Sequence, residues 1–118
     1  MVKTKMNKRV QVERSSGNVF ADLGLPHPEE HLVKATIALA IARTIRERGL
    51  TQEQAGAILS LTQPKVSDLV RGHLEKFTID RLMRYLRKLD YDVTIRFQPK
   101  PKSRGEAMIH VEGVALSA

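Results

Sequence analysis

The feature that most constrains the fold of this chain is one stretch, residues 51–72, which reads TQEQAGAILSLTQPKVSDLVRG. Thr51, with Gln54 three positions later, forms the pattern of a capping box, in which each side chain bonds the backbone N–H of the other residue. A helix is therefore expected to start after Thr51 and to end near Leu59.

A second helix is expected directly after the first. Thr62 is a favourable N-cap residue, and Pro64 lies in the first turn, where the missing N–H of proline costs little. Gly72 suits the left-handed position that ends many helices. Two capped helices with so short a connection predict a helix-turn-helix unit.

The apolar residues of this stretch indicate how its two helices pack. Ala55 is small, as required where the helices touch, and Ile58 and Leu61 are expected to bury the turn. Val66 and Leu69 are three apart and predict the inner face of the second helix. The start of that helix is then exposed, with free N–H groups and a positive dipole end. This is the end that enters a major groove in such units.

Helical periodicity extends on both sides of the unit. A helix is expected over about residues 29–48, followed by Gly49, and its two apolar stripes indicate that both of its sides are covered. Thr78 is expected to cap a further helix that ends near Leu89. The apolar period then changes to two over residues 91–97, which predicts a single strand.

These patterns together predict an all-α bundle of four to five helices with a C-terminal β-strand. The expected divisions are a flexible basic arm over 1–17, an apolar cover segment over 18–28, the helix-turn-helix domain over 29–98, and a tail over 99–118. The arm has five basic residues against one acidic residue. Two interpretations of it stay open, a solubilising tail and a contact with phosphate.

Composition limits the classes of function. The net charge of +7 favours a polyanionic partner. Aromatic residues make up only 4% of the chain, which argues against a stacking platform for single strands or RNA. The absence of cysteine excludes disulfides and thiolate sites and fits a reducing cytoplasm. No apolar run is long enough to span a membrane, so we expect a cytoplasmic protein with no membrane partner.

No metal, cofactor or catalytic site is expected. His27 and His31 are four apart, but Pro28 gives them different backbone geometries and no further ligand is near. There is no glycine-rich phosphate loop, and no nucleophile has a plausible base beside it. We therefore expect a protein that is not an enzyme.

The chain resembles the lambda-repressor-like (XRE) helix-turn-helix family over about residues 30–90. The features that match are Gly49-Leu50-Thr51-Gln52, Ala55, Leu61-Thr62-Gln63, Val66-Ser67, Leu69 and Gly72. The resemblance implies a lambda-repressor-like bundle that binds double-stranded operator DNA as a homodimer.

The resemblance also implies roles for matching residues. Gln52 would contact phosphate and brace Gln63, which would read a base, adenine being the favoured partner of an amide. Pro64 departs from the family pattern, because many relatives have a polar base-reading residue there, and it offers only an apolar contact. The expected DNA-binding residues, with Lys65 and Ser67 on base or phosphate and Arg71 on phosphate, are Gln52, Thr62, Gln63, Pro64, Lys65, Ser67 and Arg71.

The segment before this domain is similar to that of HigA-type antitoxins of toxin–antitoxin pairs. Residues 18–25, NVFADLGL, carry the likeness together with Pro26 and Pro28-Glu29-Glu30. It implies an antitoxin that neutralises a cognate toxin and represses its own operon. The apolar residues Val19, Phe20 and Leu23 are expected either to pack on the first long helix or to contact the toxin. The alternatives are a stand-alone repressor without a toxin partner and a small nucleic-acid-processing enzyme.

The predicted strand over residues 91–97 needs a partner, because a lone strand leaves backbone groups unpaired at both edges. We expect it to pair antiparallel with the same strand of a second copy about a two-fold axis through Thr94; residues 108–111 are the rival partner. Self-pairing sets Asp92 opposite Arg96 of the other copy and makes the apolar face self-complementary. The expected dimerisation residues are Tyr91, Val93, Thr94, Ile95 and Phe97.

Overall fold

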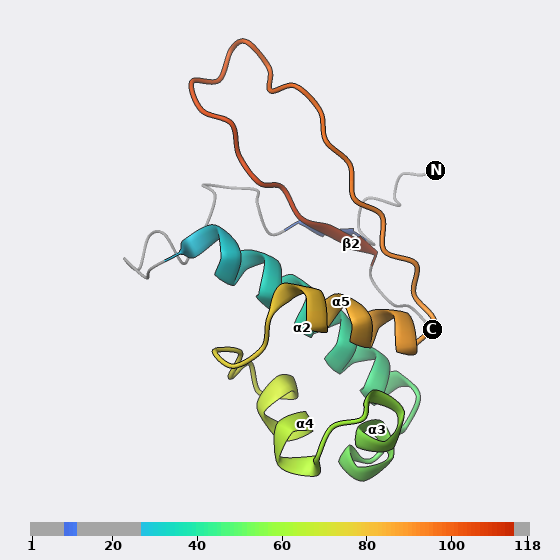
Figure 1. Ribbon diagram of the computed structural model, residues 1–118. Helices are drawn as coiled ribbons and strands as arrows, with labels where there is room; N and C mark the ends of the chain where they lie inside the picture. Colours follow the sequence, from blue (N-terminus) through green and yellow to red (C-terminus); the bar gives the residue numbers. More distant parts are fainter. Residues whose placement is uncertain (1–8, 12–26, 115–118) are drawn as a thin grey trace.

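The computed structural model describes residues 9–11 and 27–114 of the chain. Its elements are β1 (Arg9–Gln11), α2 (Pro28–Glu47), α3 (Gln52–Leu59), α4 (Gln63–Val70), α5 (Ile79–Lys88) and β2 (Glu112–Val114). Figure 1 shows α5 lying along α2, with α3 and α4 together on one side of this pair. On the other side lies the long loop between α5 and β2, residues 89–111. The helices confirm the predicted all-α helix-turn-helix bundle.

α2 begins and ends within one residue of its predicted limits. Its first turn holds Glu29 and Glu30, whose charges suit the positive end of the helix dipole. At its other end Gly49 has φ +65°, as expected for the left-handed residue. The N–H of Gly49 donates to Arg46 O at 3.1 Å and that of Leu50 to Ile45 O at 3.0 Å, which is the Schellman pattern.

The same Schellman pattern ends α5, but its left-handed residue is not a glycine and was not predicted from the sequence. Asp90 has φ +71°, and its N–H donates to Arg87 O at 3.0 Å. The N–H of Tyr91 donates to Leu86 O at 3.0 Å and so completes the motif. This reversal turns the chain back toward α2.

The hydrophobic core lies between α2 and the other three helices. Its largest fully buried side chains are Ile41, Leu59, Val66, Leu69, Leu82 and Leu89. Leu74 and Phe77 join them from the connection between α4 and α5, and Phe77 packs edge-on against Tyr85 with ring centroids 6.2 Å apart. The sequence pattern missed these three residues because a short connection shows no helical period and Tyr85 directly follows the charged Arg84 in a helix rich in basic residues.

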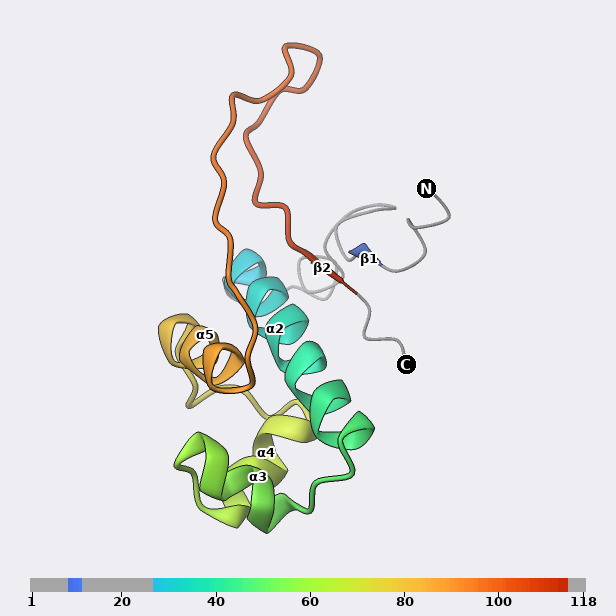
Figure 2. The same cartoon turned by 90° about the vertical axis from the view of Figure 1, so that its right-hand side faces the viewer.

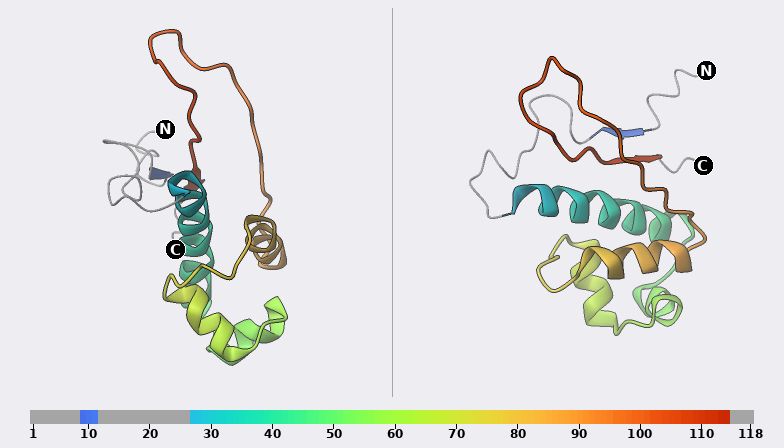
Figure 3. Two further views of the ribbon diagram at one scale, coloured as in Figure 1. Left: turned by 60° about the vertical axis from the view of Figure 1, so that its left-hand side comes forward. Right: turned by 45° about the horizontal axis from the view of Figure 1, so that its top comes forward.

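The second side of α2 faces β2 (Figures 2 and 3). β1 and β2 pair antiparallel, with Arg9 opposite Val114 and Gln11 opposite Glu112. Residues 9–11 belong to the arm that was predicted to be flexible, and the structure places them in a strand instead. The toxin-binding candidates Val19, Phe20 and Leu23 lie outside the described residues.

The strand predicted over residues 91–97 is not formed within the chain, and the C-terminal strand is β2 instead. Residues 108–111 do not pair with this segment either. The physical reason is the lack of a ladder partner, because in the part of the chain that the structure describes the backbone N–H groups of residues 92–98 donate to no other backbone group. Among the described helices none has both the length and the apolar character needed to cross a membrane.

Candidate nucleic-acid interface

The capping box predicted at the start of α3 is confirmed. Thr51 Oγ1 accepts a hydrogen bond from the Gln54 N–H at 3.0 Å, and Gln54 Oε1 accepts one from the Thr51 N–H at 2.8 Å. These two bonds satisfy backbone donors that would otherwise lack partners. They fix the direction in which α3 leaves α2.

A tight turn connects α3 to α4. Ser60 adopts the left-handed conformation, with φ 62°, and the Leu61 N–H donates to Gly56 O at 2.9 Å. Gly56 is buried, and a Cβ added there would meet the Leu61 carbonyl oxygen well inside van der Waals contact. Sequence reasoning singled out the neighbouring Ala55, which is fully buried, and missed Gly56. The adjacent pair of small residues in α3 was the available signal.

The packing of the two helices follows the prediction except at one residue. Val66 and Leu69 are 0% and 1% exposed and form the inner face of α4. Leu61 is half-buried, but Ile58 is 39% exposed and does not bury the turn. Ile58 lies one position before Leu59, which takes the core position, so helical geometry turns Ile58 outward.

The start of α4 differs from an ordinary capped helix. Thr62 occupies the N-cap position, but its side chain makes no capping hydrogen bond. Pro64 has no N–H to offer, and the N–H groups of Lys65 and Val66 both donate to the Thr62 carbonyl oxygen at 3.0 Å. The exposed Thr62 side chain therefore does not cap the helix.

A hydrogen bond joins the first residues of the two helices. Gln63 Nε2 donates to Gln52 Oε1 at 2.9 Å. Gln63 is exposed and Gln52 is half-buried, so the better-packed side chain holds the more exposed one. This is the bracing that the family resemblance implied for Gln52.

The remaining candidate residues lie along α4. Pro64 and Lys65 are exposed in the first turn, and Ser67 is half-buried one turn later. Arg71 is exposed, and its Nη1 lies 3.5 Å from Ser67 Oγ as a hydrogen-bond donor. The helical period puts Pro64, Ser67 and Arg71 on the side opposite Val66 and Leu69. Lys65 lies in the first turn of α4, and the bond between Gln63 and Gln52 adjoins the same end of the helix. We call the predicted DNA-binding residues the interface surface: Gln52, Thr62, Gln63, Pro64, Lys65, Ser67 and Arg71.

α5 adjoins this surface at the turn. Lys88 Nζ donates to Ser60 Oγ at 3.3 Å and connects the last turn of α5 to the end of α3. At the other end of α5, Thr78 Oγ1 accepts from the Arg81 N–H at 3.3 Å. A hydrogen bond from the Thr78 hydroxyl, backbone N–H groups and the charge of Arg84 lower the pKa of the Asp80 carboxyl below its usual value. Over residues 9–11 and 27–114, no three His, Asp or Glu side chains are grouped as metal ligands.

Comparison with known proteins defines the class of this fold. A family model described as a helix-turn-helix domain matches residues 19–98, and the chain belongs to that family. A solved structure named "Putative XRE Family Transcriptional Regulator" is 43% identical to this chain, with a TM-score of 0.69. The match covers 73% of this chain and 97% of that one, so the chain is a member of the XRE helix-turn-helix family. No curated protein matches the sequence.

Proposed function

We propose that this chain is a sequence-specific repressor that reads double-stranded operator DNA through the start of α4. The observation that carries the proposal is the hydrogen bond from Gln63 Nε2 to Gln52 Oε1 on the exposed end of α4. An amide group has two donor hydrogens and one acceptor oxygen. With one hydrogen used by Gln52, Gln63 keeps one donor and one acceptor, the set that adenine N7 and N6 require in the major groove.

The neighbouring residues supply the contacts that position the helix. Gln52 uses only its oxygen in the bond to Gln63 and keeps its NH₂ group for a phosphate. Lys65 and Arg71 bring positive charge, and the Thr62 hydroxyl is a further donor. Pro64 presents an apolar ring suited to a thymine methyl group. Family membership supports a regulator that acts in the cytoplasm by binding DNA and that has no enzymatic activity.

A binding experiment tests this function. The full chain is titrated onto the duplex upstream of its own gene and onto a scrambled duplex of equal length, at one fixed salt concentration. We expect the upstream duplex to bind at least about a thousandfold more tightly, as specific sites do. Equal affinity for both duplexes would reject sequence-specific reading of this operator.

We propose further that the chain is an antitoxin that neutralises a cognate toxin and represses the operon that encodes both. The likeness of residues 18–30 to the segment before the domain in HigA-type antitoxins supports this finer function. The proposed toxin-contacting residues are Val19, Phe20 and Leu23, and a stand-alone repressor is the alternative.

The test of the antitoxin role is co-expression with the product of the adjacent reading frame, followed by purification through a tag on this chain. A stoichiometric complex that is lost on deletion of residues 1–25, while DNA binding persists, supports the antitoxin. Deletion that leaves the complex intact removes residues 18–25 as the contact. A lack of any complex and of any growth inhibition by the neighbour favours the stand-alone repressor.

A further inference from the structure

We propose that residues 91–97 pair with the same residues of a second copy of this chain in an antiparallel ribbon centred on Thr94. The segment follows the left-handed turn at Asp90. Its first residue, Tyr91, is held by a backbone hydrogen bond from its N–H to Leu86 O. Within the described residues, the next seven N–H groups donate to no backbone acceptor. Such a row of free donors and acceptors is a template for another strand.

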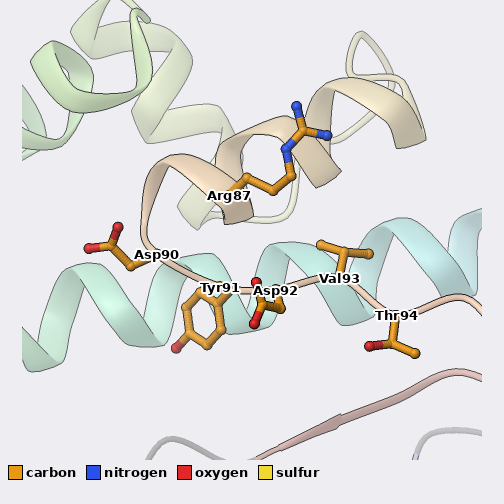
Figure 4. A pocket seen from close by; sticks show the side chains of 6 residues that line it. All are labelled: Arg87, Asp90, Tyr91, Asp92, Val93 and Thr94. Atoms are coloured by element: carbon orange, nitrogen blue, oxygen red, sulfur yellow. The ribbon is translucent and has the colours of Figure 1, made fainter.

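Half-buried and exposed side chains alternate over residues 91–94, and all side chains over residues 95–97 are exposed. Tyr91 and Val93 are half-buried, and in Figure 4 Tyr91 points toward α2 while Val93 points toward α5. The Tyr91 hydroxyl lies 2.8 Å from Thr44 Oγ1 and anchors the segment on α2. Ile95 and Phe97 have the same parity but are 65% and 91% exposed. One half of the apolar face is therefore covered by the helices and the other half is bare.

A two-fold axis through Thr94 accounts for this division. It sets Tyr91 beside the partner's Phe97 and Val93 beside the partner's Ile95, on the same face of the ribbon. That face is directed at the helices of the first chain, so each helical body covers the apolar half that the other chain leaves bare. An open hollow lies beside the segment and is lined by residues 90–94 and Arg87 (Figure 4).

The polar face matches in the same register. Asp92 lies opposite the partner's Arg96, and Arg96 opposite the partner's Asp92. Neither residue makes a salt bridge within the part of the chain that the structure describes. A shift of one residue would send the apolar side chains to the other face and separate the charges. This match identifies a second copy, rather than another protein, as the occupant.

Disulfide crosslinking tests the register directly, because the chain contains no cysteine. Residues on the axis of an antiparallel pair have Cα atoms about 4.5–5.5 Å apart, within reach of a disulfide. Thr94→Cys should therefore give a covalent dimer under mild oxidation. Asp92→Cys is the matched control, because Asp92 is also exposed but lies about 14 Å from its own symmetry mate, so this variant should stay monomeric on a denaturing gel. Equal crosslinking of the two variants, or none, overturns the proposal.

Sedimentation of the full chain tests the same ribbon without oxidation. Wild type should be a dimer, and Ile95→Asp should raise the dimer dissociation constant at least tenfold with an unchanged helical spectrum. Asp92→Arg should also weaken the dimer, and Asp92→Arg combined with Arg96→Asp should restore it. A dimeric Ile95→Asp variant, or a double variant no stronger than the single one, contradicts the arrangement.

These experiments contain no DNA, so their failure would leave the proposed reading by α4 intact. If the ribbon forms, two copies of α4 are related by a two-fold axis. Such a dimer matches an operator built as an inverted repeat.

Discussion

The side-chain amides of Gln63 and Gln52 are joined by a 2.9 Å hydrogen bond that runs from the first residue of α4 to the first residue of α3. The bond restricts the rotation of an exposed side chain before any ligand arrives. A recognition group held in this way loses less conformational entropy on binding than a free one.

Replacement of these two residues, alone and together, is expected to show that they act as a unit. Gln63→Ala should weaken binding to the operator by about 1–3 kcal/mol and leave binding to a scrambled duplex almost unchanged. Gln52→Ala should weaken operator binding less than Gln63→Ala does. The double variant should lose less binding free energy than the sum of the two single losses, because Gln52 can orient Gln63 only when Gln63 is present. Fluorescence anisotropy at fixed salt measures all four affinities. Strict additivity would show that the hydrogen bond does not contribute to recognition.

Lys65 is expected to act on the phosphate backbone rather than on a single base. Lys65→Ala should weaken operator and scrambled DNA by similar factors and reduce the slope of log affinity against log salt by about one. Lys102→Ala removes the same charge from an exposed position in the loop of residues 89–111, which lies away from α4, and serves as the control. An unchanged salt slope for Lys65→Ala would remove this residue from the interface.

The turn between α3 and α4 should not tolerate a side chain at Gly56. Gly56→Ala places a Cβ against the Leu61 carbonyl oxygen and should destabilise the fold by about 1–3 kcal/mol, since the buried turn must move. Gly105→Ala is the control, because nothing lies within 4 Å of a Cβ there, and its effect should stay within about 0.5 kcal/mol. Urea unfolding followed by circular dichroism gives both values. Equal midpoints for the two variants would contradict the close approach.

Asp90 holds a conformation that favours glycine, and its replacement should stabilise the protein. The left-handed region costs a residue with a Cβ about 1–2 kcal/mol, whereas glycine adds about 0.5–1 kcal/mol of unfolded-state entropy to be lost. Asp90→Gly should therefore raise the unfolding free energy by about 0.5–1 kcal/mol, measured by urea denaturation. Asp90→Ala, which keeps the strain, should give no such gain.

The start of α5 should show a dependence on pH through Asp80. The pKa of Asp80 is lowered in the folded state, first by the Thr78 hydroxyl, so the carboxylate stabilises the fold above its unfolded pKa. That contribution disappears as the pH falls through the lowered folded pKa. Thr78→Ala should move the Asp80 pKa up toward its usual value in an NMR titration and, by loss of the cap, cost about 0.5–2 kcal/mol. Thr78→Ser keeps the hydroxyl and should change neither.

The parts of the fold that sequence reasoning predicted are those with local signals. Thr51 and Gln54 mark the start of α3, and Gly49 and Gly72 mark two helix ends, because capping chemistry involves residues a few positions apart. The left-handed end of α5 was missed because Asp90 takes the glycine-like conformation without being glycine.

The features that sequence reasoning missed depend on contacts between distant segments. Leu74 and Phe77 enter the core from a connection without helical periodicity. β1 pairs with β2, which lies nearly the whole length of the chain away in the sequence. The candidate interface was predicted through family resemblance together with the exposed start of α4. The close approach at Gly56 required the three-dimensional turn, since only there does Leu61 meet it.

The pairing of β1 with β2 has a consequence for the order of folding. Segments so distant in the sequence lose much chain entropy when they meet, and three residue pairs offset little of it. During synthesis, β1 must also wait until β2 has left the ribosome, by which time α2 can provide a surface for β2. We therefore expect the β1–β2 pair to form last and to open first. Its opening separates β1 from β2 while α3 and α4 keep the geometry that places Gln63.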